Sequence, residues 1–291
     1  MKAKKGSISD IIFHIVFVLF CFSTLLPFLL TLIVSFSDEM SIIKNGYQLF
    51  PDKLSLDAYG ILLSGDNVFN AYKISIIVTV SGTLLALLVS SMLAYAISVE
   101  KVKYRNVIAL FMFFTMLFGA GLVPWYIVMT QFLHLKNSIL ALIVPMLVSP
   151  YNVFLIRNYF KSLPKEMVES AEIEGATPLG TLVRVIIPLS APIIATVSLF
   201  ISLGYWNDWN LSLWLIDKRE LYPIQFMLYK INSLINYMKS QGSKNAYGGL
   251  SIPKESVQYA TVMITIGPII LVYPFIQKYF VKGIMIGAVK G

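Results

Sequence analysis

The chain is poor in charge and in cysteine. Only 13% of its 291 residues are charged, whereas 57% are hydrophobic, and the mean hydropathy is +0.75. Soluble domains carry about 25% charged residues, so the shortage of charge excludes an ordinary soluble domain and predicts an integral membrane protein. The single cysteine, Cys21, lies within an apolar run. It has no partner for an intrachain disulfide and says nothing about redox compartment.

Residues that carry out chemistry are also scarce. The two histidines, His14 and His134, are far apart and have no cysteine or carboxylate at metal-ligand spacing, so we expect no metal site. The phosphate-loop pattern G-x-x-x-x-G-K-[ST] is missing. We therefore expect neither catalytic residues nor a cofactor in this chain. The net charge of +8 comes from bases scattered among the loops, which indicates membrane topology rather than nucleic-acid binding.

Six apolar stretches are each long enough to cross a bilayer as a helix, which takes about 20 residues. The alternation over about 10 residues that marks a membrane β-barrel strand is not seen. The first stretch is too long for the apolar part of a cleavable signal. The predicted fold is therefore all-α and polytopic, with six transmembrane helices. The predicted spans are residues 11–36, 70–98, 106–130, 138–157, 186–211 and 259–281.

Lysine and arginine gather at alternate ends of these spans. They mark the N-terminal tail (1–10), the 98–105 and 158–185 loops and the C-terminal tail, whereas the 37–69 loop has five acids and two bases. Because basic loops stay in the cytoplasm, we expect both termini and the 158–185 loop there, in a multi-pass cell-membrane protein. With six spans, the 212–258 loop must lie on the outer side although it has six bases. The preference of basic residues for the cytoplasm is weaker in long loops such as this one.

Residues 164–188 interrupt the apolar pattern with helix signals. Acids in the first turns of this segment complement the positive end of a helix dipole. Gly175 is expected to end the first helix by adopting a positive φ. Thr177 and Pro178 fit the N-cap and the first position of a second helix. We predict a cytoplasmic helical hairpin; the alternative is a simple solvated connector.

An aromatic and polar cluster lies near the outer end of the fifth predicted span. It fits an aromatic belt at the membrane interface. It also fits the lining of a substrate path, in which aromatic rings pack on a sugar while Asn and Asp bond its hydroxyls. The candidate substrate-path residues are Tyr205, Trp206, Asn207, Asp208 and Trp209.

Two further patterns leave alternatives open. Apolar residues recur with helical spacing from Leu221 to Met238. That amphipathic helix would either lie on the outer membrane surface or dock an external partner. Glycines and prolines within the spans fit ordinary kinks and close helix packing, or mobile spans that line a path.

The 164–188 segment resembles the EAA motif of permease subunits of type I ABC importers. The family pattern is E-A-A, three residues, G, nine residues and I-x-L-P, and this spacing is kept in full. The matching residues are Glu169-Ser-Ala171, Gly175 and Val185-Ile-Ile187-Pro188; the departures, Ser170, Val185 and Ile187, are small or conservative. The WNDW cluster, the DKRELYPIQ segment (217–225) and the tail QKYFVKGIMIGAVKG (277–291) resemble the carbohydrate-uptake branch, closest to its permeases for polysaccharide-derived oligosaccharides.

This resemblance implies a type I ABC importer permease fold over residues 11–291 and import of a sugar or oligosaccharide by alternating access. The hairpin would be a coupling helix that docks into an ATPase dimer, which would hold ATP and Mg²⁺. The other implied partners are a homologous second permease in a heterodimer, an extracellular or periplasmic solute-binding protein and the bilayer of a bacterial membrane. The implied coupling residues are Glu166, Glu169, Ala171, Glu172, Gly175, Ala176 and Pro188.

Two other classes of function compete with this interpretation. A stand-alone ion-coupled carrier of a small polar solute needs charged residues within the membrane and usually internal repeats. The sequence offers one acid at the edge of a span, Asp208, and no clear repeat. A membrane-embedded enzyme needs clustered His, Asp or Glu, which this chain lacks. The predicted function is therefore that of an importer permease.

Overall fold

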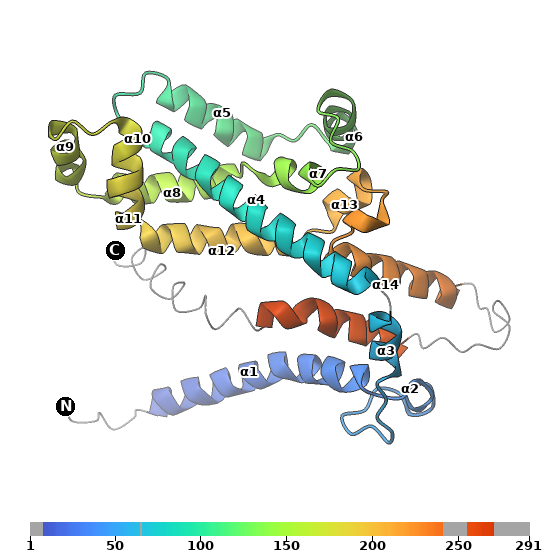
Figure 1. The fold of residues 1–291 in the computed structure, drawn as a ribbon. Helices are drawn as coiled ribbons and strands as arrows, with labels where there is room; N and C mark the ends of the chain where they lie inside the picture. The colour runs from blue at the N-terminus through green and yellow to red at the C-terminus, as the bar shows by residue number, and fades with distance from the viewer. Residues whose placement is uncertain (1–7, 65, 241–254, 271–291) are drawn as a thin grey trace. The chain divides into compact units, whose positions relative to one another are not determined.

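The computed structural model describes residues 8–64, 66–240 and 255–270 (Figure 1). These residues are helical apart from loops and one isolated antiparallel bridge between Ser37 and Leu54, which confirms the predicted all-α class. The chain divides into two compact units. The first takes in the described residues up to Val68 and from Leu228 to Pro268, and the second takes in the remainder.

The first unit begins with the apolar helix α1 (Ile8–Ser35), which matches the first predicted span. None of its span-forming stretch is buried within the chain, as expected for a helix that faces lipid. Asp38 then caps α2 (Glu39–Asn45) by accepting a hydrogen bond from the backbone N–H of Ser41. The first unit therefore combines an apolar helix, exposed along its span-forming stretch, with a short helix whose start is capped by Asp38.

A second group of contacts in this unit centres on the helix formed by residues 255–270. The short helix α3 (Asp57–Leu63) packs against it through an apolar cluster that includes Ala58 and Ala260. The Glu39 carboxylate accepts hydrogen bonds from the backbone N–H groups of Glu255 and Ser256 at 3.0 and 2.9 Å. It thereby satisfies free donors at the start of this helix. The helix covers 259–270 of the sixth predicted span; residues 271–281 lie outside the described ranges.

The second unit is organised around the long helix α4 (Asp66–Ser98), which confirms the second predicted span. Within this unit, α12 (Ala191–Asn207) packs against α8 (Pro150–Ser162), and α8 also contacts α5 (Arg105–Leu117). Their buried apolar side chains form one continuous core. Members of this core that are almost fully buried are Ile97, Val153, Ile156, Val197 and Leu215.

The third predicted span is a broken helix. It consists of α5 and a second piece made of α6 (Leu122–Ile127) and a π-helical turn (Val128–Phe132), and the two are bent by 118°. The break has a local cause: Phe118 is extended and Gly121 has φ +82°. That conformation interrupts helical hydrogen bonding and favours glycine. The span predicted over 106–130 is thus formed by two helical pieces and not by one straight helix.

The fourth predicted span, 138–157, is also divided. A short piece, α7 (Leu140–Ile143) with a 3-10 turn (Val144–Met146), meets α8 at 51°. Pro150 begins α8 after the extended Ser149, because a proline disfavours helical backbone in the residue before it.

The fifth predicted span, 186–211, is also bent near its start. The helical residues Pro178–Leu189 meet α12 at 88°, so residues 186–189 are not in line with the rest of this span. By length and composition, the described residues offer two spans, or up to five if each bent pair counts as one. The predicted number of six is not confirmed.

Beyond α12 lie α13 (Asn210–Leu215), a 3-10 turn (Arg219–Leu221) and α14 (Ile224–Ser240). The last confirms the amphipathic helix expected over 221–238. Its two faces differ in burial: Ile224 and Ile235 are buried, whereas Leu234 and Tyr237 are exposed.

Candidate functional site

The hairpin over residues 164–188 begins with α9 (Lys165–Ile173), which starts directly after Pro164. Gly175 ends it with φ +80°. The N–H of Gly175 donates to the carbonyl of Glu172, and the N–H of Ala176 donates to the carbonyl of Ala171, both at 3.0 Å. This pair of bonds is the Schellman arrangement, which favours glycine at the left-handed position. The predicted helix–glycine break is confirmed.

The second arm of the hairpin is a series of short helical pieces. The Thr177 side chain accepts a hydrogen bond from the N–H of Gly180 and caps α10 (Pro178–Thr181), as predicted. A π-helical turn (Leu182–Ile186) and α11 (Ile187–Leu189) follow. Leu182 and Ile186 are buried in the core of the unit. The hairpin is therefore packed onto the same core as the spans.

Most of the predicted coupling residues face outward. Of the seven, all but Ala171 are exposed: Glu166, Glu169, Glu172, Gly175, Ala176 and Pro188. Ala171 is only 7% exposed, and α9 contacts both α10 and the π-helical turn. Its small side chain therefore serves close packing with the rest of the chain. Its predicted contact with an ATPase is not tested by this geometry.

The exposed side of the hairpin also carries apolar side chains that sequence reasoning missed. Ile173 is 87% exposed, Leu179 59% and Met167 46%. A solvated connector would gain nothing from large apolar groups in water, whereas apolar groups mixed with polar ones are typical of a protein interface. Ile173 could have been found from the sequence, because it is a large apolar residue between two glutamates, Glu172 and Glu174, next to the glycine break.

Two ion pairs join α9 to the loop between α4 and α5. The ammonium of Lys101 lies 2.5 Å from the Glu172 carboxylate, and that of Lys165 lies 3.3 Å from the Glu100 carboxylate. The hydrogen bond and charge of Glu172 raise the pKa of Lys101. Exposed pairs contribute only about 0–1 kcal/mol to stability, so we infer that they orient α9 rather than hold the fold together.

The predicted substrate-path residues do not form one common lining. Tyr205 and Trp206 are buried, and the Tyr205 O–H donates to the carbonyl of Ile143 at 2.9 Å. Asn207 is exposed and accepts a hydrogen bond from the Gln225 amide at 3.2 Å. These contacts are packing and cross-linking contacts, so direct substrate contact by this set remains a prediction.

Asp208 and Trp209 complete the predicted set. The Asp208 carboxylate accepts a hydrogen bond from the backbone N–H of Leu211 at 3.1 Å, which caps the start of α13. Trp209 is 39% exposed. This capping role explains why an acid stands at position 208, so Asp208 need not take part in ion-coupled transport.

A cavity of about 500 Å³ lies beside this cluster, between the α5–α6 break and the start of α13. Its lining is mostly apolar and includes Gly119, Trp125 and Asn210. Sequence reasoning interpreted these glycines either as kinks and close helix packing or as part of mobile spans that line a path. Among the described residues, no group of three or more His, Cys, Asp or Glu side chains is placed to hold a metal ion.

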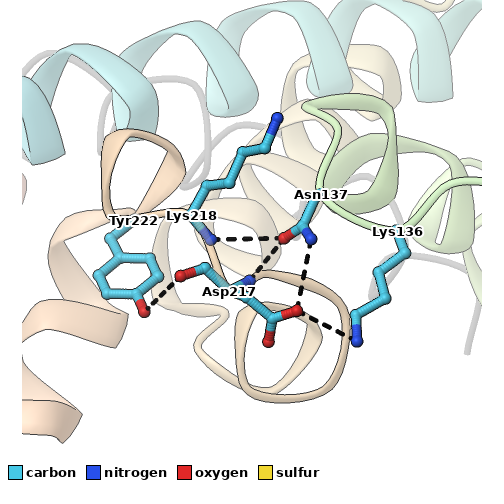
Figure 2. Close-up of polar contacts among 5 residues, drawn as sticks. All are labelled: Lys136, Asn137, Asp217, Lys218 and Tyr222. Atoms are coloured by element: carbon cyan, nitrogen blue, oxygen red, sulfur yellow. Dashed lines mark hydrogen bonds and ion pairs between the residues drawn. The ribbon is translucent and has the colours of Figure 1, made fainter.

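Asn137 is a polar hub that sequence reasoning also missed (Figure 2). Its side-chain oxygen accepts hydrogen bonds from the backbone N–H groups of Asp217 and Lys218, and its amide nitrogen donates to the Asp217 carboxylate. Asn137 has φ +59°, a left-handed conformation that asparagine tolerates better than most residues.

Lys136 supports the same network. Its ammonium lies 3.1 Å from the Asp217 carboxylate, and that bond raises the pKa of Lys136. The Tyr222 O–H donates to the backbone carbonyl of Asp217 (Figure 2). The loop before α7 and the segment after α13 are thus fastened together by side chains from both.

We expect Asn137→Ala to lower stability by about 2.5–3.5 kcal/mol. Alanine adds about 1–2 kcal/mol of left-handed strain, and each lost exposed hydrogen bond costs about 0.5 kcal/mol. The unfolding temperature of the purified protein checks this. His134→Asn, at another left-handed position, is the control and should leave it unchanged. Equal unfolding temperatures for Asn137→Ala and the wild type would contradict the hub role.

Bent apolar spans and a polar hairpin packed on the same core define an α-helical membrane protein of the transporter class. Residues 82–286 match the family described as "Binding-protein-dependent transport system inner membrane component". The chain belongs to this family and is a permease subunit of an ABC importer. In such importers, a separate ATPase subunit hydrolyses ATP, a second permease completes the membrane part, and a solute-binding protein delivers the cargo.

Comparisons with single proteins agree. Protein LplC of Bacillus subtilis (strain 168) is 37% identical over 270 residues, which are 92% of this chain and 90% of LplC. The polygalacturonan/rhamnogalacturonan transport system permease protein YtcP of the same organism is 33% identical over 288 residues, 99% of this chain and 100% of YtcP.

A solved structure is similar over the same length. It is the crystal structure of a bacterial ABC transporter involved in the import of the acidic polysaccharide alginate. One chain of it has a TM-score of 0.83 and 29% sequence identity to this protein. The match covers 96% of this chain and 100% of that one, which agrees with the permease fold.

Proposed function

We propose that this permease imports a sugar or oligosaccharide derived from a polysaccharide, and that its 164–188 hairpin transmits the movement of the ATPase to the spans. The relatives support the substrate class, since their names include polygalacturonan/rhamnogalacturonan, arabinooligosaccharides and trehalose/maltose. The observation that carries the coupling role is the hairpin itself. It is closed by the left-handed Gly175, packed onto the core at Leu182 and exposed along its acidic side.

The mechanism follows from rigid packing. A force on α9 is transmitted by direct contact to the π-helical turn, which is buried at Leu182 and Ile186. That turn continues through α11 to the 88° bend before α12. Rigid elements joined at a bend can rock together, as alternating access requires. The proposal places the hairpin and both termini in the cytoplasm, in keeping with the basic loops.

The proposed assembly has an ATPase dimer that holds ATP and Mg²⁺, a homologous second permease and an external binding protein. This chain would supply half of the passage and no catalytic residue. A stand-alone carrier is not favoured, since family membership accounts for the fold and Asp208 acts as a helix cap.

Reconstitution in liposomes tests the proposed function. Both permeases and the ATPase, supplied with the binding protein, should accumulate labelled pectin-derived or malto-oligosaccharides only when ATP is present on the ATPase side. Accumulation by the permease alone, driven by an ion gradient, would overturn the proposal.

A charge exchange tests the ion pair between the α4–α5 loop and α9. Glu172→Lys should reduce ATP-dependent uptake by about fivefold at most, because it replaces the exposed ion pair with Lys101 by two like charges that repel. Combining it with Lys101→Glu restores an opposite pair and should return uptake to within about twofold.

The control is Lys103→Glu, which makes the same charge change as Lys101→Glu in the same loop. The Lys103 ammonium lies over the Tyr104 ring and does not pair with an acid among the described residues. It should leave uptake unchanged. If the exchanged pair stays as defective as Glu172→Lys alone, Glu172 does not act through Lys101, and the orienting role fails.

A further inference from the structure

Three cationic residues lie in the region where α5 begins and α8 ends. Arg105 is the first residue of α5. Arg157 and Lys161 lie one turn apart near the end of α8, so they share a face of that helix. The two helices contact each other, and the charges of Arg157 and Arg105 both act on the Lys161 ammonium. Figure 1 shows the start of α5 and the end of α8 at the same end of this unit as α9.

The positive charge of this cluster is not balanced by the described part of the chain. Glu100, the acid that acts on Lys161, forms its ion pair with Lys165. Arg157 uses its Nε to donate to the carbonyl of Ile97 at 3.1 Å, which fixes the guanidinium against the end of α4. Like charges held together repel, so this arrangement favours an anion.

Arg105 adds a stronger requirement. Arg105 is partly exposed, and its covered Nη1 atom has no hydrogen-bond partner among the residues described. A buried donor on a charged group costs free energy unless an acceptor satisfies it. The start of α5 has no side-chain cap, so free N–H groups and the helix dipole add to the positive potential.

The surroundings indicate where the anion comes from. Beyond Arg105, the outward face of α5 is apolar: Val107 is 64% exposed and Leu110 and Phe111 are each 68% exposed. Tyr104, 60% exposed, directly precedes Arg105, as aromatic residues do at the headgroup level of a membrane. The cations thus lie where a lipid-facing surface begins, which is the depth of phospholipid phosphates.

We propose that Arg105, Arg157 and Lys161 bind the phosphate of an anionic phospholipid headgroup, with the acyl chains lying along the apolar face of α5. A soluble phosphate would satisfy the charges but would leave the adjoining apolar surface unused. Because Arg157 also holds the end of α4, the bound lipid would brace the loop that positions α9.

Native mass spectrometry of the purified permease tests this. The protein is released from vesicles of phosphatidylcholine mixed with phosphatidylglycerol, and the retained lipid is identified. The wild type should retain phosphatidylglycerol in preference to phosphatidylcholine. Arg105→Gln and Lys161→Gln should each weaken retention about fivefold, since one cation near a membrane surface is worth about 1 kcal/mol.

Control variants distinguish an effect of the lost charge on lipid binding from a general effect of substitution on folding. Lys161→Arg keeps the charge and should retain phosphatidylglycerol like the wild type. Arg184→Gln removes an exposed cation of the hairpin's second arm and should do the same. Equal retention of phosphatidylglycerol by all variants would overturn the proposal, as would its displacement by millimolar inorganic phosphate or equal retention of phosphatidylcholine.

Discussion

Replacing Gly175 with valine is expected to abolish ATP-dependent uptake while the binding protein still captures substrate. Gly175 has φ +80° and donates one hydrogen bond of the Schellman turn, and its left-handed backbone allows Ala176 to donate the other. A left-handed residue other than glycine costs about 1–2 kcal/mol, and a β-branched one more. The turn would open, and α9 would no longer have a fixed angle to the rest of the hairpin. Uptake in liposomes and substrate binding in solution check the two halves of this prediction.

Two further substitutions at Gly175 test whether backbone conformation or steric space requires glycine there. A Cβ at Gly175 would meet no atom within 4 Å, so space is not the obstacle and backbone conformation alone should decide. Gly175→Asn, which tolerates the left-handed region, should keep most of the uptake, and Gly175→Ala should fall between. If asparagine is as harmful as valine, backbone conformation is not the reason that glycine is needed.

Replacing Gly82 with alanine is expected to destabilise the fold by about 1–3 kcal/mol, the usual cost of overpacking a core. A Cβ there would lie 2.6 Å from Cζ of Tyr205 and 2.8 Å from its Cε atoms. The ring has little room to move, because Tyr205 is 3% exposed and its O–H is bonded to the Ile143 carbonyl. The unfolding temperature and the yield of monodisperse protein should both fall.

Gly204→Ala is the matched control for Gly82→Ala. Its Cβ would lie 3.3 Å from Cε of Met146, the flexible end of a side chain that adapts readily. Its loss of stability should therefore be smaller. Equal unfolding temperatures for the two variants would show that the Gly82–Tyr205 contact does not limit the packing of α4 against α12.

The parts of the fold that the sequence predicts are those decided by local chemistry. The helices α1 and α4 follow from apolar runs longer than a bilayer requires. The hairpin follows from Gly175, Thr177 and Pro178, since each residue fits only a few positions of a helix. Those predictions depend on neighbours a few residues away, so no tertiary contact was needed to make them.

The remaining features depend on contacts between distant segments. A glycine such as Gly121 within an apolar run fits a straight, tightly packed span as well as a sharp bend. Hydropathy alone therefore could not predict the 118° break. Lys101 and Glu172 are 71 residues apart, and nothing near either one indicates the other.

The aromatic cluster near the end of α12 shows the same limit. Its composition suits a substrate path or a membrane belt, yet Tyr205 is buried against Gly82 and Asp208 caps α13. Composition indicates which contacts a side chain can make, and the packing of the helices decides which contacts it does make.

Disulfide cross-linking measures most directly whether α9 is the surface that meets the ATPase. Cys21 is the only cysteine, so Cys21→Ser supplies a clean background for Ile173→Cys, at a side chain that is 87% exposed at the end of α9. In the assembled importer, with cysteines placed across the exposed surface of the ATPase, this position should form a cross-link whose yield changes with ATP. Tyr237→Cys, on the exposed side of α14, should form none. Cross-linking at Tyr237→Cys and none at Ile173→Cys would contradict the coupling role of the hairpin.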